Sequence, residues 1–247
     1  MAPRRGGGTK LTRLRAAICA FALGLSGCAS GKPPGREFID ECERRLPPGR
    51  VQVRTAPVEP VVDKSLSYQE LTRMAGEDGG YRWVLGLTRP ALRVEAKWGF
   101  TSLQDRRTGQ SCIRPALQMT LRYQPVLVYV GREFVEDACA FDFVYAHEMR
   151  HVDVHVRRLR EVSLQLQSEL QNRLAGSTHI GERDDLERRL KAEIGNYWVP
   201  RAERDLKDVR REHAAIDTPE EYARAQTACD GRVARYLPRL RQAVDAR

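Results

Sequence analysis

Apolar and polar side chains alternate in the first half of the chain. Residues 92–100 and 117–123 both show this period of two, which is typical of half-buried strands. The polar residues 105–109 lie between them, so we predict that the two strands pair as an antiparallel hairpin. Gln124-Pro125 interrupts the second run, and residues 126–130 are predicted as a short separate strand.

A helical period replaces this alternation after residue 137. Residues 138–174 contain neither proline nor glycine, and Gly176 stands where a helix end is expected. Apolar residues recur in this segment at spacings of three, four or seven, and they are Phe141, Val144, Tyr145, Val152, Val156, Leu159, Leu166 and Leu170. The pattern predicts one long amphipathic helix.

Shorter helices are predicted on both sides of the long one. Residues 37–46 and 68–75 are the first two, and residues 184–211 carry a further amphipathic pattern that Pro200 kinks or breaks. Residues 217–221 combine a cap, a proline and acids in the order of a helix start. The pattern predicts an α+β fold, in which an N-terminal antiparallel sheet precedes the long helix and a C-terminal helical hairpin or bundle.

The long helix carries the sequence His147-Glu148-Met149-Arg150-His151. Helical residues four apart face the same way, so both imidazoles can bind one zinc ion. Glu148 can then reach a water molecule beside the ion and act as general base. We therefore expect His147 and His151 as zinc ligands and Glu148 as the catalytic residue. The alternative is a pair of surface histidines on an ordinary helix.

The N-terminus has the features of an export signal. Five cations and no acid precede the apolar residues 16–25, a run too short to span a bilayer. The run ends in Leu25-Ser26-Gly27-Cys28, which resembles the lipobox of bacterial lipoproteins, so we expect lipid on Cys28. Ala29 follows in place of an aspartate, which favours the outer membrane, facing the periplasm. An ordinary secretory cleavage site and an uncleaved anchor are the alternatives.

Removal of this leader changes the charge of the chain. The formal net charge is +9, and the loss of the five leader cations leaves +4. Basic clusters at residues 157–160 and 210–211 lie among acids on predicted helices, as solvated faces do. Because no aromatic residues are interleaved with them, we do not expect a nucleic acid as partner.

The cysteines predict disulfides. One of the six lies in the leader, and Cys28 is the predicted lipid site. The remaining four are Cys42, Cys112, Cys139 and Cys229. An even number of cysteines in an oxidising compartment indicates two disulfides. We expect Cys112 to pair with Cys139 and Cys42 with Cys229, although the number and spacing of the cysteines also allow the two other connectivities.

These residues resemble a family of bacterial secreted zinc-dependent proteases that is catalogued as a domain of unknown function. The resemblance rests on Gly86-Leu87-Thr88, on Cys112, on Cys139-x-Phe141-Asp142 and on the His-Glu-x-x-His sequence shortly after it. It spans about residues 68–174, and His-Glu-x-x-His is its specific motif. The resemblance implies a zincin-like fold, zinc on the two motif histidines and catalysis by the motif glutamate.

The sequence leaves the third metal ligand open. His155 lies about 12 Å along the helix axis from His147, too far to share its ion on an unbroken helix. If the next helix folds back on the long one, five other residues come within reach, namely Asp205, Asp208, Glu212, His213 and, further on, Asp217. The family that the chain resembles has a later Tyr-Asp, Thr and His-Gly stretch. Ile216-Asp217-Thr218 keeps only its aspartate and threonine.

Together these features predict a lipid-anchored zinc metallopeptidase that hydrolyses peptide or peptidoglycan amide bonds. Residues 1–27 are the lipoprotein signal peptide, residues 28–49 a tether and short helix, and residues 50–247 a zincin-like domain. Its sheet part is 50–131 and its helical part 135–247. An extended peptide would add to a strand edge at residues 126–130.

Two other functions are compatible with the sequence. The first is a non-catalytic envelope lipoprotein that binds an unknown protein partner through its helices, with a structural metal or none. The second is a metal-buffering protein that uses His147, His151 and His155 and needs no role for Glu148.

Overall fold

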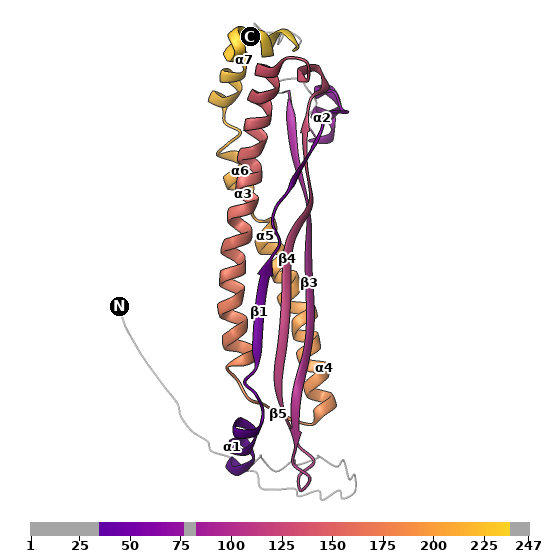
Figure 1. The fold of residues 1–247 in the computed structure, drawn as a ribbon, viewed down its shortest axis with the longest axis vertical. Coiled ribbons are helices and arrows are strands. Elements are labelled where there is room, and N and C mark those ends of the chain that lie inside the picture. The colour runs from indigo at the N-terminus through magenta and orange to yellow at the C-terminus, as the bar shows by residue number, and fades with distance from the viewer. Residues whose placement is uncertain (1–34, 77–82, 238–247) are drawn as a thin grey trace, which may run out of the picture. The chain divides into compact units, whose positions relative to one another are not determined.

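The computed structural model describes residues 35–76 and 83–237 (Figure 1). The predicted signal peptide, Cys28 and most of the tether lie outside the described residues. The described part is a mixed α/β fold, with most strands before the long helix and most helices after it. Among the described residues, no helix is long and apolar enough to cross a membrane.

The elements follow one another as α1 (Arg36–Arg45), β1 (Arg50–Thr55), β2 (Pro60–Asp63), α2 (Tyr68–Met74), β3 (Gly86–Gln104), β4 (Ser111–Val130), the 3-10 turn η1 (Arg132–Phe134), α3 (Ala138–Leu170), the π turn η2 (Gln171–Ala175), β5 (His179–Gly181), α4 (Arg183–Glu193), the π turn η3 (Ile194–Trp198), α5 (Val199–Lys207), α6 (Arg210–Ala214) and α7 (Pro219–Arg235). The predicted helices at 37–46, 68–75 and 138–174 are confirmed, and so is the helix start at 217–221.

β4 is the central strand of a five-stranded sheet. β3 pairs with it antiparallel along its whole length, as the hairpin prediction required, and β5 is antiparallel too. β1 and β2 follow each other along the opposite edge of β4 and are parallel to it, so the prediction of an antiparallel sheet was wrong for these two strands. Alternation of side chains defines the two faces of a strand but not the direction of its neighbour.

The predicted break at Gln124-Pro125 was also wrong, because β4 is continuous through it. On β3, the register shifts between Pro90 and Leu92, opposite this dipeptide. The missing proline N–H therefore falls where the ladder is already irregular. Residues 126–130 pair with β2 on one side and β3 on the other, so the free strand edge that we predicted there is occupied.

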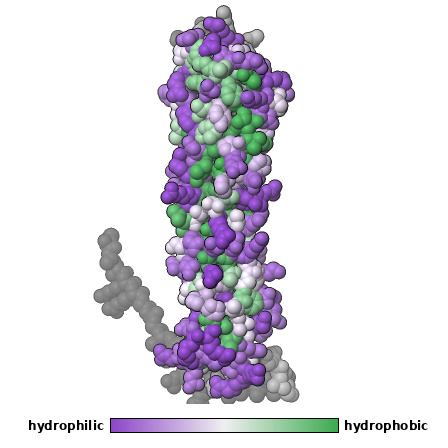
Figure 2. Space-filling view, in the orientation of Figure 1, coloured by the Kyte–Doolittle hydropathy of each residue, from purple (hydrophilic) through white to green (hydrophobic). Residues whose placement is uncertain are grey.

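α3 packs along the sheet through its apolar stripe (Figure 1). Buried residues of α3 such as Leu159 and Leu166 share one core with Met119 and Leu121 of β4 and with the segment from α4 to α5. The Gln167 side chain adds a polar tie to β1, because its Oε1 accepts from the Val53 N–H (2.7 Å) and its Nε2 donates to the Val51 carbonyl (3.1 Å). On the face drawn in Figure 2, hydrophobic residues form a broken band between hydrophilic borders.

Pro200 does not break the helical segment that contains it. The π turn η3 comes directly before α5, and Pro200 lies in the first turn of α5, where its missing N–H is not required. The helical path ends instead at Asp208, whose φ of −83° and ψ of 74° are not helical. The chain already runs back antiparallel to α3 from α4 onward, and beyond the bend α6 and α7 contact α3 (Figure 1).

The four predicted cysteines form two disulfides, but the connectivity is Cys42–Cys112 and Cys139–Cys229. The predicted pairs, Cys112–Cys139 and Cys42–Cys229, were wrong. Cys112 is at the start of β4 and Cys139 follows its end, so the unbroken strand separates them by about 60 Å. Two cysteines are linked at each end of the hairpin instead.

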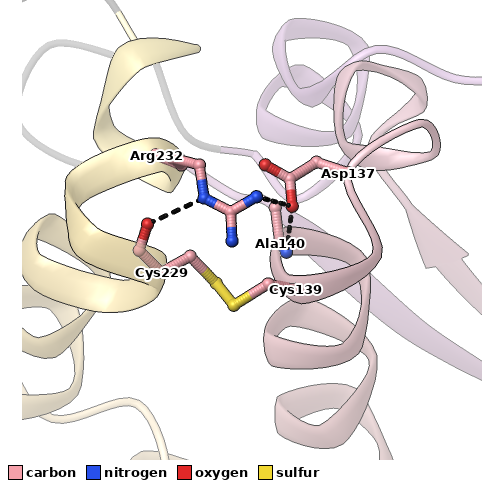
Figure 3. The surroundings of a disulfide bond; sticks show 5 residues. All are labelled: Asp137, Cys139, Ala140, Cys229 and Arg232. Carbon is pink, nitrogen blue, oxygen red and sulfur yellow. Dashed lines mark hydrogen bonds and ion pairs between the residues drawn. A yellow bond between two sulfur atoms is a disulfide. The ribbon is translucent and has the colours of Figure 1, made fainter.

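Figure 3 shows the disulfide that joins the first turn of α3 to α7. Beside it, Asp137 accepts from the Ala140 N–H (3.1 Å) as the cap of α3 and also pairs with Arg232 Nη1 (2.8 Å). Arg232 Nε donates to the carbonyl of Cys229 (3.0 Å). A covalent bond and an ion pair thus hold α7 against the start of α3.

Removal of this disulfide should destabilise the protein. In the double variant Cys139→Ala/Cys229→Ala, the unfolded chain regains the freedom of a loop with a sequence separation of 90 residues. We expect a loss of about 2–5 kcal/mol in the free energy of unfolding, measured by denaturant titration of the oxidised protein. Thiol counting on denatured, unreduced wild type should find all four cysteines blocked, and four reactive thiols would contradict the assignment.

Candidate metal centre

Three side-chain atoms converge at one point in the cleft between α3 and the start of α7. His147 Nε2 lies 3.0 Å from Asp217 Oδ1, His151 Nε2 lies 3.1 Å from the same oxygen, and the two nitrogens are 3.2 Å apart. Ligand atoms at 2.0–2.1 Å from a tetrahedral ion are about 3.3 Å from one another. His147, His151 and Asp217 could therefore hold a metal ion.

Asp217 reaches this position because of the helix start that follows it. The Thr218 hydroxyl caps α7 by accepting from the Glu221 N–H (3.3 Å), and Pro219 occupies the first turn. On the other side, the Asp217 N–H donates to the carbonyl of His213 (3.0 Å). These constraints turn the aspartate away from its own helix and toward α3.

The other candidates for a third ligand do not join the group. The carboxylate of Asp205 pairs with Arg201 (3.4 Å). The backbone carbonyl of Asp205 accepts from Arg158, which lies two helical turns after His151 on α3, so Asp205 is beside a later part of that helix. His213 approaches His151 with Nδ1 against Nδ1 (2.8 Å), on the side of the ring opposite the three converging atoms. Among the described residues, Asp208 and Glu212 are likewise outside the group.

His155 also lies outside the group, as the unbroken helix predicts. Its ring contacts Tyr123 and His213, with centroid distances of 4.9 and 4.8 Å. Its buried Nδ1 has no hydrogen-bond partner among the described residues. Burial, together with the charges of His213 and His151, lowers the pKa of His155 to about 4. His155 is therefore a neutral residue of the interior at neutral pH.

Each motif histidine has a polar partner at its Nδ1. For His147 it is the carboxylate of Glu221, whose Oε1 lies 3.3 Å away and also pairs with Arg150. Arg150 Nη2 lies 2.8 Å from the same Nδ1, but a guanidinium only donates, so of the two it is Glu221 that can accept from an Nδ1–H. His151 has His213 as its partner. A histidine that gives its Nε2 lone pair to a metal carries its proton on Nδ1, and a partner there fixes the ring. Glu221 and His213 are thus in position to orient the two imidazoles, a role that the sequence analysis did not foresee for Glu221.

Glu148 is buried beside the three converging atoms, with 4% of its surface exposed. The Thr88 hydroxyl donates to its carboxylate (2.9 Å) and also lies 3.1 Å from its backbone carbonyl. Gly86 is packed so closely that a Cβ there would be 2.7 Å from Glu148 Cγ and 2.8 Å from Oε1. The first residues of β3 therefore hold this carboxylate in place and admit no side chain at position 86.

Burial and the neighbouring histidines shift the pKa values of the two acids, Glu148 and Asp217, in opposite directions. Burial raises the pKa of Glu148, although the charges of His151 and His147 and the Thr88 hydrogen bond oppose it. Burial also acts to raise the pKa of Asp217, but hydrogen bonds from His147 and His151 outweigh it and hold that pKa below its usual range. Asp217 is therefore ionised at neutral pH, as a metal ligand must be. Glu148, in contrast, binds a proton more tightly than an exposed glutamate does.

A cavity of about 270 Å³ opens beside the three atoms. Its walls come from the start of β3 and the residues before it, from the motif turn of α3, and from His213, Asp217 and the first turns of α7. Glu148 and the three ligand atoms form one end of it. A substrate in the cavity would therefore contact the centre directly.

Comparison with known proteins gives no relative, since no family model, no curated protein and no solved structure matches this chain. The function of the centre must therefore be inferred from its own geometry.

We expect the metal to depend on all three ligand residues. His147→Ala, His151→Ala and Asp217→Ala should each lose stoichiometric metal, because each removes one of the three converging atoms. Glu148→Gln should retain it, since its carboxylate is not one of these atoms. Elemental analysis of the purified protein after dialysis measures the content, and thermal denaturation shows whether each variant is folded.

Three further variants, Glu221→Gln, Asp208→Ala and His155→Ala, extend this test. Glu221→Gln should weaken metal affinity by about 10–100-fold without abolishing binding, as partners of ligating histidines do. Asp208→Ala is the matched control, an aspartate outside the group, and should bind like wild type. Full occupancy in Asp217→Ala would disprove the assignment of the third ligand, and an empty site in His155→Ala would show that the ligand set is wrong.

Proposed function

We propose that the protein is a zinc-dependent metallopeptidase. The observation that carries the proposal is a buried glutamate against a group of two histidines and one carboxylate, at the end of a cavity. Two histidines and a carboxylate are a common ligand set of catalytic zinc, which keeps one position open for water or substrate. A structural zinc has four protein ligands, whereas the described part of the chain brings three together here.

The residues around the centre suit amide hydrolysis. Zinc held by His147, His151 and Asp217 would polarise the scissile carbonyl and lower the pKa of a water molecule. Glu148 would accept the proton of the attacking water and then deliver it to the leaving amine. Thr88 keeps the Glu148 carboxylate oriented by donating a hydrogen bond to it.

An extended peptide would pair with β3 and not, as first expected, with residues 126–130. The outer edge of β3 has no strand partner among the described residues, and its residues 86–88 line the cavity. Leu85 accepts from the Gly131 N–H, so in an antiparallel ladder the backbone groups of Gly86 and Thr88 point away from β4. Strand addition there would bring a peptide, or the stem peptide of peptidoglycan, alongside Glu148.

We also propose that the chain is a member of the secreted zinc-dependent protease family that its sequence resembles, and that its domain is zincin-like. The proposal also includes export, lipid on Cys28 and a place at the outer membrane facing the periplasm. Two disulfides fit an oxidising compartment of this kind.

A non-catalytic lipoprotein that binds a partner through its helices is the competing function. α3 exposes Val156 and Leu164, at 42% and 64% of their surfaces, which a partner could cover. Such a protein would need no carboxylate beside the metal ligands, so the role of Glu148 separates the two functions.

Hydrolysis should therefore fail when Glu148 changes and the metal stays. We expect Glu148→Gln to bind zinc like wild type and to lose peptide hydrolysis by about 10²–10⁴-fold, because the amide cannot accept the proton. Gly86→Ala should lower the rate too, since its methyl group would displace the Glu148 side chain. Activity on peptides and on peptidoglycan is measured with zinc content determined in parallel.

Glu161→Gln is the control for this pair, because Glu161 is an exposed glutamate on the same helix. It should hydrolyse at the wild-type rate. Wild-type activity in Glu148→Gln would disprove the peptidase function and favour the competing one.

Anchoring is tested separately at Cys28. The protein should fractionate with membranes through a fatty acid on this residue, because a lipobox-like sequence follows a basic and then an apolar segment. Cys28→Ser should abolish labelling with radioactive fatty acid. Labelling that persists in this variant, or a mature N-terminus at another residue, would contradict the lipoprotein assignment.

A further inference from the structure

The cavity beside the metal centre changes from polar to apolar along its length. At one end are Glu148, His151 and Asp217. The other end lies toward the start of α3, about one helical turn, or about 6 Å, before His147 and Glu148. The residues that line this end are apolar or aromatic. They are Trp83 and Leu85 before β3, Phe143 and Val144 on α3, and Tyr222 and Ala225 on α7.

The cavity is large enough for a bulky side chain. Its volume of about 270 Å³ exceeds the roughly 150 Å³ of an engineered apolar cavity that holds benzene. Burial of an aromatic or branched side chain in such a space is favourable, because it removes a large apolar area from water. A polar or very small side chain would gain little there.

The charges in the cavity point to the same kind of ligand. None of the described residues that line it is lysine or arginine, whereas Glu148, Asp217 and Glu221 are acids. Apart from the proposed zinc ion, a carboxylate bound there would have no cationic partner among the residues that line the cavity in the described part of the chain. Peptidoglycan stem peptides carry methyl side chains and free carboxylates, so they match neither the apolar end nor the acidic one.

We infer that the apolar end receives a bulky hydrophobic side chain next to the bond that is cleaved. The substrates are then proteins or peptides with such a residue, and not peptidoglycan stem peptides. This inference rests on the proposed peptidase function and specifies its substrate class. The backbone of the substrate runs along the edge of β3, and its side chain enters between Phe143 and Ala225.

The first test compares substrates with the whole mature protein loaded with zinc. A peptide pool with every residue type at each position is digested, and purified peptidoglycan is treated in parallel. Mass spectrometry of the products should show one position beside the cleaved bond that is enriched in Leu, Phe, Tyr, Met and Trp. Peptidoglycan should remain intact.

The second test changes the size of the apolar end. Ala225→Leu narrows it, so kcat/KM for a peptide with phenylalanine at the enriched position should fall about 10–200-fold relative to its alanine analogue. Ala223→Leu is the matched control, because Ala223 is an exposed residue of α7 outside the cavity. It should keep the wild-type preference. Phe143→Ala removes an aromatic wall and enlarges the apolar end. It should therefore also weaken the preference for phenylalanine over alanine, because the large side chain loses contacts there.

Binding gives a readout that does not depend on turnover. The Glu148→Gln variant, loaded with zinc, is titrated calorimetrically with the phenylalanine peptide and with its alanine analogue. The phenylalanine peptide should bind more tightly, and Phe143→Ala in the same background should reduce this difference.

The remaining outcomes distinguish failure of the inference from failure of the proposed function. Cleavage without side-chain preference, or a preference that Ala225→Leu and Phe143→Ala both leave unchanged, would overturn the inference and leave the peptidase function standing. Cleavage of peptidoglycan alone would do the same. If the zinc-loaded protein cleaves neither substrate and binds neither peptide, the proposed function fails and the inference fails with it.

Discussion

The contact between the motif turn of α3 and the first residues of β3 is the constraint on which the site depends. It buries Glu148, and burial of a carboxylate is costly unless its oxygens have partners. Thr88 supplies a hydrogen bond to the carboxylate, and Gly86 supplies the space. A side chain at position 86 would fill this space, and an apolar residue at position 88 would remove the hydrogen bond. The residue types at these two positions of β3 are therefore determined by Glu148, about 60 residues later in the chain.

α7 completes the site from the other side, and its first turn has two functions. Thr218 and Pro219 start the helix, and acids in the first turn suit its N-terminal dipole. The same turn directs Asp217 to the two motif histidines and Glu221 to His147 Nδ1. Because the Cys139–Cys229 disulfide ties the far part of α7 to the start of α3, the helix that carries these acids is held at both ends against the helix that carries the histidines.

The sequence predicted the elements better than their partners. A 33-residue helix without proline or glycine has an unmistakable period, and its motif, start and stop were all placed correctly. Strand direction, the continuity of β4 at Pro125 and the disulfide pairs all depend on which segments meet, and side-chain periodicity contains no information on that. Asp217 shows the same limit. Its position just before Thr-Pro-Glu-Glu marked it as a residue of a helix start, but the pattern could not show that this start lies against His147.

The β3–β4 hairpin also sets the distance between the two ends of the described fold. At one end, α1 is linked to the start of β4 through Cys42–Cys112, and α1 begins eight residues after Cys28. At the other end, Val130 pairs with Gly86, which packs against Glu148. Eighteen residues of strand between Cys112 and Val130 span about 60 Å. The metal centre therefore lies at the end of the hairpin remote from α1. The strand that supports the site thus also sets the distance between α1 and the metal centre.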